Sequence, residues 1–580
     1  MAAALAVYFV DLGGSSIWDA NEAFYVETPR EMIAAHDFIN PSFNYLPRFN
    51  KPVLSYWIVA GFYRVFGVSV AVQRIPIAIG AMVIIACAFF LARVADPRLM
   101  RDAECGMRDA ERGMRDAECG MRDAEFGMRD AGSGGREVGS GIRDGRLGIG
   151  DSALWAALGL AANPRLVMFA RRIFIDVWLT MFLALTLTCF ALSERYPERR
   201  RYLGWMYVAV GLGTLTKGPV AIVIPALAFA LYLAVRGQLR RVRDMMIPSG
   251  VVIVACIVLP WYVALYHEHG WAQIRSFLLT ENLERYTEGA GVRQVRGLLF
   301  YLPVLFSDSF PWSAFLIGGA VFSWRRRNPL ELLLWSWIVV IVGFFSLSAG
   351  KQDLYIFPVV PAAAAIAGLM MARACEDASA RRWVRGTLVA VGALLAAAGL
   401  GALYVFVGAG RVYALGGATG IGAMAIVGGV MCAALAVTGR PFRAAGVLLA
   451  AIIAVNWVFV LRVLPEFERY KPVPALSREI ASRLQPGDVV ANYQVALPSM
   501  VYYLGRHVDE HFDTPSFVAA INSRDRVYGV LTDDDYHALA AEIGSRTCVL
   551  NRYPVFNVKL GSVLARAPLP ELLLISNECR

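Results

Sequence analysis

Long apolar segments constrain this chain more than any other feature. A bilayer core about 30 Å thick needs about 20 apolar residues for one helix to cross it. Hydrophobic residues make up 57% of the chain and charged residues only 18%, which is typical of a polytopic α-helical membrane protein. Segments that reach or approach the required length lie near residues 70–94, 152–169, 174–193, 202–215, 218–235, 246–266, 298–322, 330–348, 353–373, 384–407, 417–437 and 443–464.

Basic residues alternate between the two ends of these segments. Clusters of arginine occur on every second connection, and the positive-inside rule places such clusters in the cytoplasm. The net charge of +10 therefore reflects membrane orientation, and no nucleic-acid partner is predicted. The clusters are Arg93–Arg98, Arg195–Arg201, Arg236–Arg243, Arg325–Arg327, Arg373–Arg385 and Arg440–Arg443.

The alternation is consistent with about 13 transmembrane helices, an inner amino end and an outer carboxyl end. It requires residues 53–67 to lie on the outer surface without crossing. Residues 2–10 supply only a truncated first span, as expected for a shortened chain or a misassigned start, and they lack the basic start and cleavage site of a signal peptide.

Four heptads of the form MRDAExG lie between residues 95 and 150 and run into a stretch rich in Gly, Ser and Arg. Glycine interrupts every heptad and the apolar stripe is thin, which disfavours a coiled coil. We predict a disordered low-complexity cytoplasmic insertion that is dispensable for folding and activity.

The composition changes after Pro465. LSREIASRL predicts an amphipathic helix, DVVANYQV and MVYYLG predict strands, and RVYGVLTDDDYHALAAEIG predicts strand, turn and helix. The predicted units are therefore the first helices at 1–94 with an outer loop at 17–69, the insertion at 95–150, a helix bundle at 151–465 and a small extracytoplasmic α/β domain at 466–580. Cys548 and Cys579 either form a disulfide or remain free thiols.

Charged residues gather on five predicted outer loops, at one face of the membrane. Carboxylates there can act as general bases, and Lys or Arg can hold a phosphate and stabilise charge on a leaving group. For any single residue, an interfacial anchor remains the alternative. The charged and polar residues are Asp19, Glu22, Glu27, Arg30, Glu31, Lys51, Arg171, Arg172, Asp176, Lys217, Glu281, Asn282, Arg285, Lys351 and Asp353.

Several short motifs occur in an order that resembles the bacterial GT-C glycosyltransferases of the protein O-mannosyltransferase and aminoarabinose lipid A transferase superfamily. The resemblance covers about residues 11–370 apart from the insertion. The matching residues are Trp18, Glu22, Tyr25, Glu27, Arg30–Met32, Lys51–Pro52, Tyr56–Trp57, Asp176, Lys217–Gly218, Glu281–Arg285, Tyr301–Pro303, Pro311–Trp312, Lys351, Tyr355 and Pro358.

The resemblance implies an inverting transfer of a sugar from a polyprenyl-phosphate donor to a lipid, glycan or protein acceptor at the outer face of the cytoplasmic membrane. It implies a carboxylate base. Because the family's catalytic Asp falls on Asn21, Asp19 or Glu22 must substitute for it, and we favour Asp19 with Glu22 in support. Asp176 is a further candidate catalytic carboxylate. The donor phosphate would be held by Lys51, helped by Lys217, Arg285 and Lys351. The substrate pocket would include Asn21, Tyr25, Glu27, Arg30, Tyr56, Glu281, Asn282, Asp353 and Tyr355.

Some positions depart from the family pattern. The family's catalytic Asp falls on Asn21, which cannot act as a base, and a family Arg falls on Phe24. Relatives that bind a metal have ligands where this chain has Asn50 and the 294–297 region, so we expect that metal site to be absent. His267 and His269 form the nearest alternative, and a solvated pair is favoured over a ligand pair. No cofactor is firmly predicted, although a divalent cation is left open.

Two other classes remain as alternatives. A transporter or flippase of lipid-linked sugars would also be polytopic, and Asp308, inside an apolar segment, favours it. Transporters place charges near the midplane of two related halves, whereas this chain has no repeat of its helix bundle and its charges gather at one face. A catalytically inactive binding relative is the third reading, which rests on Asn21.

Overall fold

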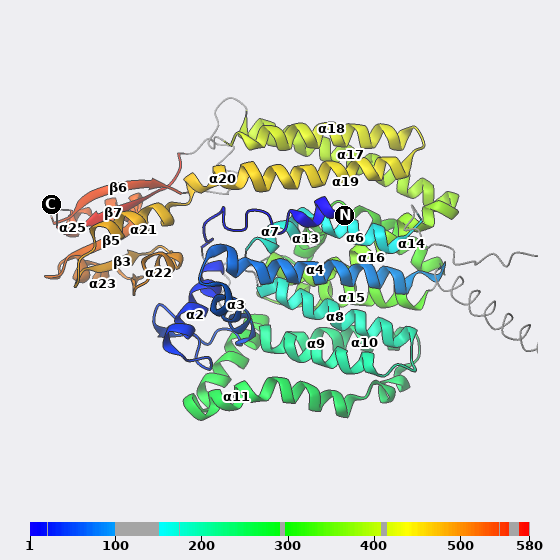
Figure 1. Cartoon of the computed structure of the whole chain (residues 1–580), viewed down its shortest axis with the longest axis horizontal. Helices are drawn as coiled ribbons and strands as arrows, with labels where there is room; N and C mark the ends of the chain where they lie inside the picture. Colours follow the sequence, from blue (N-terminus) through cyan, green and yellow to red (C-terminus); the bar gives the residue numbers. More distant parts are fainter. Residues whose placement is uncertain are drawn as a thin grey trace, which may run out of the picture.

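The chain forms a long helical bundle that carries a smaller α/β domain at one end (Figure 1). This computed structural model describes residues 1–19, 21–98, 150–172, 175–289, 296–326, 328–407, 415–544, 546–555 and 568–578. Most of the predicted insertion and Cys579 lie outside the described residues, so the predictions about them stand as made.

Every predicted apolar segment coincides with one helix or with two or three consecutive helical elements. One helix, α11, extends past the predicted apolar segment 246–266 and continues through residues 267–278 after a break at Gly270, whose φ is +68°. The helices of the bundle and its connections are α1 (Ala2–Ala6), α4 (Val70–Ala95), α6 (Ser152–Ala161), α7 (Pro164–Ala170), α8 (Ile175–Arg195), α9 (Arg201–Lys217), α10 (Val220–Val235), η1 (Leu239–Met245), α11 (Ile247–Leu278), the π-helix η2 (Leu279–Glu284), α12 (Arg285–Thr287), η3 (Leu298–Phe300), α13 (Tyr301–Asp308), α14 (Ala314–Arg326), α15 (Pro329–Leu347), η4 (Asp353–Val359), α16 (Val360–Glu376), α17 (Ala378–Phe406), α18 (Gly417–Val437), α19 (Pro441–Val458) and the π-helix η5 (Phe459–Val463).

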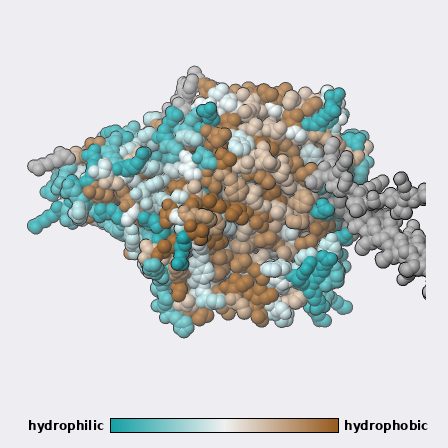
Figure 2. Space-filling model, in the orientation of Figure 1, coloured by the Kyte–Doolittle hydropathy of each residue, from teal (hydrophilic) through white to brown (hydrophobic). Residues whose placement is uncertain are grey.

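Eight helical segments in the described part of the chain are long and apolar enough to cross a bilayer, or nine if α6 and α7, bent by 56°, form one span. The remaining predicted segments fall on the shorter helices α9, α10, α13 and α14. On the face shown in Figure 2, hydrophobic residues form a band around the middle of the bundle, with hydrophilic residues toward both ends. The protein is therefore a polytopic α-helical membrane protein, as predicted.

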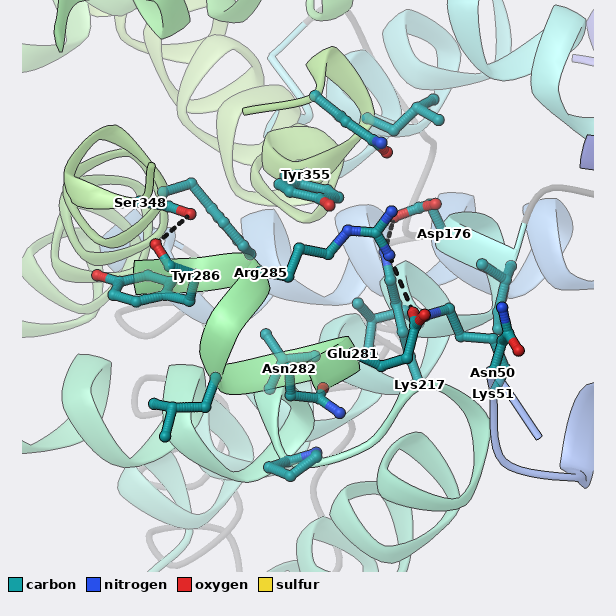
Figure 3. Close-up of a pocket in the computed structure, with 18 of the residues that line it drawn as sticks. Asn50, Lys51, Asp176, Lys217, Glu281, Asn282, Arg285, Tyr286, Ser348 and Tyr355 are labelled. Atoms are coloured by element: carbon teal, nitrogen blue, oxygen red, sulfur yellow. Dashed lines mark hydrogen bonds and ion pairs between the residues drawn. The ribbon is translucent and has the colours of Figure 1, made fainter. Parts of the chain in front are cut away.

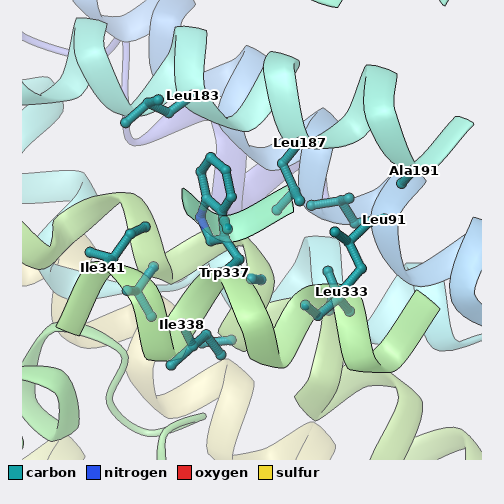
Figure 4. Packing of buried hydrophobic residues seen from close by; sticks show 14 of the residues in the cluster. Leu91, Leu183, Leu187, Ala191, Leu333, Trp337, Ile338 and Ile341 are labelled. Atoms are coloured by element: carbon teal, nitrogen blue, oxygen red, sulfur yellow. The ribbon is translucent and has the colours of Figure 1, made fainter. Parts of the chain in front are cut away.

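Trp337 lies in the largest buried cluster of the bundle, where α8 and α15 pack (Figure 4). Its side chain is fully buried beside Leu183, Leu187 and Ile341. The indole N–H donates a hydrogen bond of 3.0 Å to the carbonyl of Pro358. This contact fixes η4 against α15, and these two elements form one side of the cavity described below.

The first predicted outer loop contains α2 (Asn21–Ala35), a two-stranded hairpin of β1 (Ser42–Phe43) and β2 (Leu46–Pro47), and α3 (Leu54–Phe66). With 13 residues, α3 is about 20 Å long, too short to cross a bilayer. It therefore covers the end of the bundle without spanning it, in line with the prediction for 53–67.

The C-terminal domain has one five-stranded sheet in the order β4-β3-β5-β7-β6. Strands β3, β4 and β5 are parallel, and β7 runs antiparallel to both β5 and β6. The elements from the end of the bundle onward are α20 (Leu464–Phe467), η6 (Glu468–Tyr470), α21 (Pro472–Arg483), β3 (Val489–Tyr493), α22 (Ser499–Leu504), β4 (Asp509–His511), α23 (Thr514–Ile521), β5 (Val527–Thr532), α24 (Asp533–Ala538), α25 (Ala540–Ile543), β6 (Cys548–Pro554) and β7 (Glu571–Ser576).

The structure confirms the amphipathic helix, the strand in DVVANYQV and the strand, turn and helix that follow. The strand predicted for MVYYLG was wrong, because this segment forms α22. Its aromatic and β-branched residues favour a strand, but Pro498 precedes the helix and Gly505, with φ +64°, ends it. A short buried segment of this kind has no periodicity that separates the two states.

The C-terminal domain and the first outer loop lie in contact at the same end of the bundle. The side-chain amide of Asn44 donates to the carbonyl of Val508 at 2.7 Å, and the amide of Val508 donates back to Asn44 Oδ1 at 2.9 Å. The hydroxyl of Tyr503 accepts a hydrogen bond of 2.9 Å from the amide of Ile17. The domain therefore holds the loop that carries half of the predicted site residues.

Candidate active site

The bundle contains a cavity of about 650 Å³ (Figure 3). Helix α2, which lines it, lies at the end of the bundle that carries the C-terminal domain (Figure 1). The walls of the cavity come from α2, the segment before α3, α8, α9, α10, η2, α12, α15 and η4. The described residues that line it are Phe24, Tyr25, Arg48, Asn50, Lys51, Ile175, Asp176, Leu179, Lys217, Pro219, Val220, Val223, Leu278, Glu281, Asn282, Leu283, Arg285, Tyr286, Phe344, Phe345, Ser348, Gln352, Leu354 and Tyr355.

Lys51, Glu281 and Arg285 form the most connected group in this cavity. Lys51 Nζ and Arg285 Nη1 each lie 3.1 Å from the same carboxylate oxygen, Glu281 Oε2. The side chains are partly exposed, at 17% for Lys51, 26% for Glu281 and 27% for Arg285. Two cations from separate segments thus meet around one anionic oxygen.

The pKa of Lys51 is lowered to about 8. Burial is the largest cause, the neighbouring Lys217 and Arg285 also lower it, and Glu281 opposes them. If Lys51 must be charged to bind an anionic substrate, kcat/KM should fall as the pH rises through about 8, because this constant reports ionisations of the free enzyme. Lys51→Arg should keep its charge and move the fall to higher pH, since guanidinium does not deprotonate in this range. A pH profile of initial rates for both proteins tests this; the same profile in both would show that another group titrates.

Asp176 and Lys217 form a second ion pair in the cavity, close to the first group (Figure 3). Asp176 lies in the first turn of α8, and Lys217 is the last residue of α9. The Lys217 ammonium donates to Asp176 and lies 5.1 Å from the centre of the Tyr355 ring. A carboxylate at the amino end of a helix and a cation at the carboxyl end each complement the helix dipole, which helps to place both groups.

Arg48 is a cavity residue that the sequence analysis missed. Its guanidinium lies 3.8 Å from the centre of the Phe24 ring. Among the described residues it forms no ion pair with a carboxylate, although its charge acts on the side chain of Glu510. Its position three residues before Lys51 was the available signal, because the two side chains belong to the same short segment.

Lining residues without charge are mainly apolar and come from α8, α10, η2 and α15. They include Leu179, Val223, Leu283, Phe344 and Phe345. A cavity with four cations, two carboxylates and an apolar wall suits an amphipathic ligand with an anionic head.

The structure does not bring Asp19 or Glu22 to the cavity. Asp19 accepts hydrogen bonds of 2.7 Å from both the amide and the hydroxyl of Ser499, in the C-terminal domain. Glu22 is buried and ion-paired with Arg74 of α4, with Oε1 2.8 Å from Nε and Oε2 3.0 Å from Nη2. Both of these side chains therefore hold other parts of the protein in place.

Asn21 is the first residue of α2. Among the other predicted residues on this loop, Glu27 and Arg30 pair with each other, with Arg30 Nε 2.8 Å from Glu27 Oε2, and neither lines the cavity. Tyr56 is fully buried and stacks on Tyr25, with 5.5 Å between ring centres, so it supports the cavity wall from behind.

Lys351 and Asp353 also lie outside the lining. The ammonium of Lys351 is buried and donates to the carbonyl of Ser348 at 2.5 Å. Asp353 pairs with Arg165 of α7, which also lies 3.2 Å from Asp308. Asp308, the residue that favoured a transporter, is thus part of an ion-pair cluster at this end of the bundle.

The described residues do not fit a resident metal ion. Within that part of the chain, no three His, Cys, Asp or Glu side chains lie close enough together to hold one. Both carboxylates of the cavity already contact cations. His269 contacts Asn40 at 2.7 Å and packs on Phe49.

The chain is similar in sequence to known glycosyltransferases. Residues 146–263 match the family model for dolichyl-phosphate-mannose-protein mannosyltransferase. The undecaprenyl phosphate-alpha-4-amino-4-deoxy-L-arabinose arabinosyl transferase 1 of Pseudomonas fluorescens is 25% identical over 411 residues, which is 67% of this chain and 60% of that protein. The corresponding transferase of Pseudomonas paraeruginosa is 27% identical over 409 residues, 68% of this chain and 63% of that protein. The chain thus spans about 60% of the length of these curated relatives.

The whole chain superimposes on the crystal structure of ArnT from Cupriavidus metallidurans bound to undecaprenyl phosphate, with a TM-score of 0.72, 20% identity, and coverage of 100% of this chain and 97% of that one. The apo structure of the same protein gives the same values. This chain has the GT-C fold. The predicted fold class and the predicted resemblance to the GT-C glycosyltransferases of the aminoarabinose transferase type are confirmed.

Proposed function

We propose that the protein is an inverting membrane glycosyltransferase that moves a sugar from a polyprenyl-phosphate donor to a lipid, glycan or protein acceptor. The observation that carries this proposal is the meeting of Lys51 and Arg285 around one anionic oxygen, in a cavity whose remaining wall is largely apolar. The cations suit the donor phosphate, and the apolar wall suits the adjoining isoprenoid units. The printed names of the relatives, which contain undecaprenyl phosphate and arabinosyl transferase, support this class of donor and reaction.

In this mechanism an acceptor oxygen attacks the anomeric carbon of the sugar as the bond from that carbon to the lipid phosphate breaks. The electron pair of the broken bond leaves with the phosphate, so negative charge grows on the phosphate oxygens. Lys51 and Arg285 stabilise this charge inside a partly dehydrated cavity, where such contacts are stronger than in water. Arg48 and Lys217 make the cavity more positive around the same group.

Asp176 takes the proton when the acceptor is a hydroxyl group. It is the one of the three predicted catalytic carboxylates that lines the cavity, and its contact is with Lys217 and not with Lys51 or Arg285. An acceptor whose oxygen is already an anion would need no base, and Asp176 would then orient Lys217.

Asp176→Asn should lower transfer to a hydroxyl acceptor by roughly 100-fold or more, the usual contribution of a general base, and should leave donor binding near the wild-type level. Asp19→Asn should cost much less, because Asp19 contacts Ser499 outside the cavity. The measurement is sugar transfer in membranes supplied with radiolabelled polyprenyl-phosphate sugars. Loss of transfer in Asp19→Asn alone would return the role of base to Asp19.

We place the protein in the cytoplasmic membrane, with the cavity and the C-terminal domain on the outer side. The arginine clusters on alternate connections support this orientation. Helix α2, which lines the cavity, lies at the same end of the bundle as the C-terminal domain (Figure 1), so we infer that both face the same compartment. Sugar transfer by the intact protein separates this function from a flippase, which would move the lipid-linked sugar without breaking the glycosyl bond.

A further inference from the structure

Glu281 occupies the position between the two cations that the proposed function assigns to the donor phosphate. A single oxygen, Oε2, lies 3.1 Å from both Lys51 Nζ and Arg285 Nη1. The two cations converge on this carboxylate from the segment before α3 and from α12 (Figure 3). A phosphate oxygen contacting both nitrogens would need nearly the same place.

The surroundings of the Glu281 carboxylate leave room for it to change position. Its side chain is 26% exposed and lines the cavity. It lies on the π-helix η2, a conformation that is rare and occurs mostly as short segments at functional sites. The helical stretch around η2 has Gly270 and Gly289 toward its two ends, with φ of +68° and +73°, a backbone region that other residues rarely adopt. Because its side chain is partly exposed to the cavity, the carboxylate of Glu281 can leave this position by a change of rotamer.

We propose that Glu281 is an exchangeable counter-ion for the phosphate-binding cations. In the empty site it neutralises Lys51 and Arg285 and holds them facing each other. The donor phosphate takes its place, and after transfer Glu281 competes with the polyprenyl phosphate for the same two cations. This role rests on the proposed function and adds that product release is assisted by an internal anion.

A counter-ion role and an ordinary positioning role predict opposite changes in the affinity for polyprenyl monophosphate when the charge of Glu281 is removed. If Glu281 competes with phosphate, removing its charge must strengthen the binding of a polyprenyl monophosphate. If Glu281 only orders Lys51 and Arg285, removing its charge must weaken that binding, because the cations lose their support.

The test is the affinity of the purified full-length protein in detergent for undecaprenyl monophosphate, measured with wild type and Glu281→Gln. We expect binding roughly tenfold tighter or more in the variant, because one nearby repulsive charge is lost. Inhibition of transfer by added undecaprenyl monophosphate should become stronger by a similar factor. Glu284→Gln is the matched control, since Glu284 lies on the same π-helix but does not line the cavity, and it should bind as the wild type does.

The outcomes separate the two proposals. Wild-type binding that Glu281→Gln weakens or leaves unchanged would overturn the counter-ion role and leave the proposed function intact. Absence of binding by both proteins would overturn the proposed function itself, and the counter-ion role with it. Glu281→Ala provides a second neutral variant should the glutamine form an unforeseen hydrogen bond, and it must also bind more tightly than wild type.

Discussion

Lys51→Ala should lower kcat/KM for the polyprenyl-phosphate donor by roughly 100- to 1,000-fold, the range seen when one group that stabilises developing charge is removed. Lys217→Ala should lower it much less. Lys51 shares an oxygen with Arg285 at 3.1 Å, so both cations can reach one phosphate. The charge of Lys217 is instead engaged by Asp176.

Initial rates of sugar transfer at varied donor concentration test this order. Lys351→Met is a matched control, because Lys351 is also a lysine near the site but donates to a backbone carbonyl and does not line the cavity. Its donor kinetics should stay close to those of the wild type once the amount of folded protein is equalised. A larger loss in Lys217→Ala than in Lys51→Ala would make Lys217 the principal cation for the donor phosphate.

The sequence predicted the cavity's charged residues well for a physical reason. Charges are costly in an apolar chain, so Lys51, Lys217 and Arg285 stand out, and the positive-inside rule assigns their loops to one face. Those loops come close together because the helices that they connect pack in one bundle. The helical segments were predicted for a similar reason, since apolar length is a strong signal.

The partners of Asp19 and Glu22 could not be predicted from the sequence. Asp19 and Glu22 lie in the same polar loop, and nothing in the local sequence says that Ser499, in another domain, engages one of them or that Arg74 engages the other. A carboxylate's role depends on which partner the fold brings to it. For Arg48, the aromatic surface of Phe24 is likewise supplied by tertiary contact.

Loss of the Arg74 side chain should destabilise the protein strongly. Its side chain is fully buried. Besides the two bonds to Glu22, its guanidinium donates to the carbonyls of Leu12, Ser15 and Ser16 at 2.7, 2.8 and 3.0 Å. The amide of Trp18 donates to Glu22 at 2.9 Å. One arginine therefore joins α4, the chain before α2, and α2 itself.

Arg74→Met should cost about 3–5 kcal/mol, the usual effect of breaking a buried ion pair and leaving the other charge unpaired. Glu22→Gln should cost less, because glutamine can still accept a hydrogen bond from the guanidinium. The measurement is the temperature at which the detergent-solubilised protein loses its monodisperse form, compared among wild type and both variants. Asp37→Asn serves as a control, since Asp37 is a loop carboxylate that contacts Asn40 and the amide of Ile39 without an ion pair to a lysine or arginine among the described residues.

Stability and activity together decide what Glu22 does. If Glu22 is structural, as its burial and its partner Arg74 indicate, Glu22→Gln should lower the melting temperature, and the folded fraction should transfer sugar at close to the wild-type rate. If Glu22 supported the base, transfer would fall with the melting temperature unchanged. The second result would require Glu22 to leave Arg74 during the reaction, and Arg74→Met would then impair transfer even at temperatures where the protein remains folded.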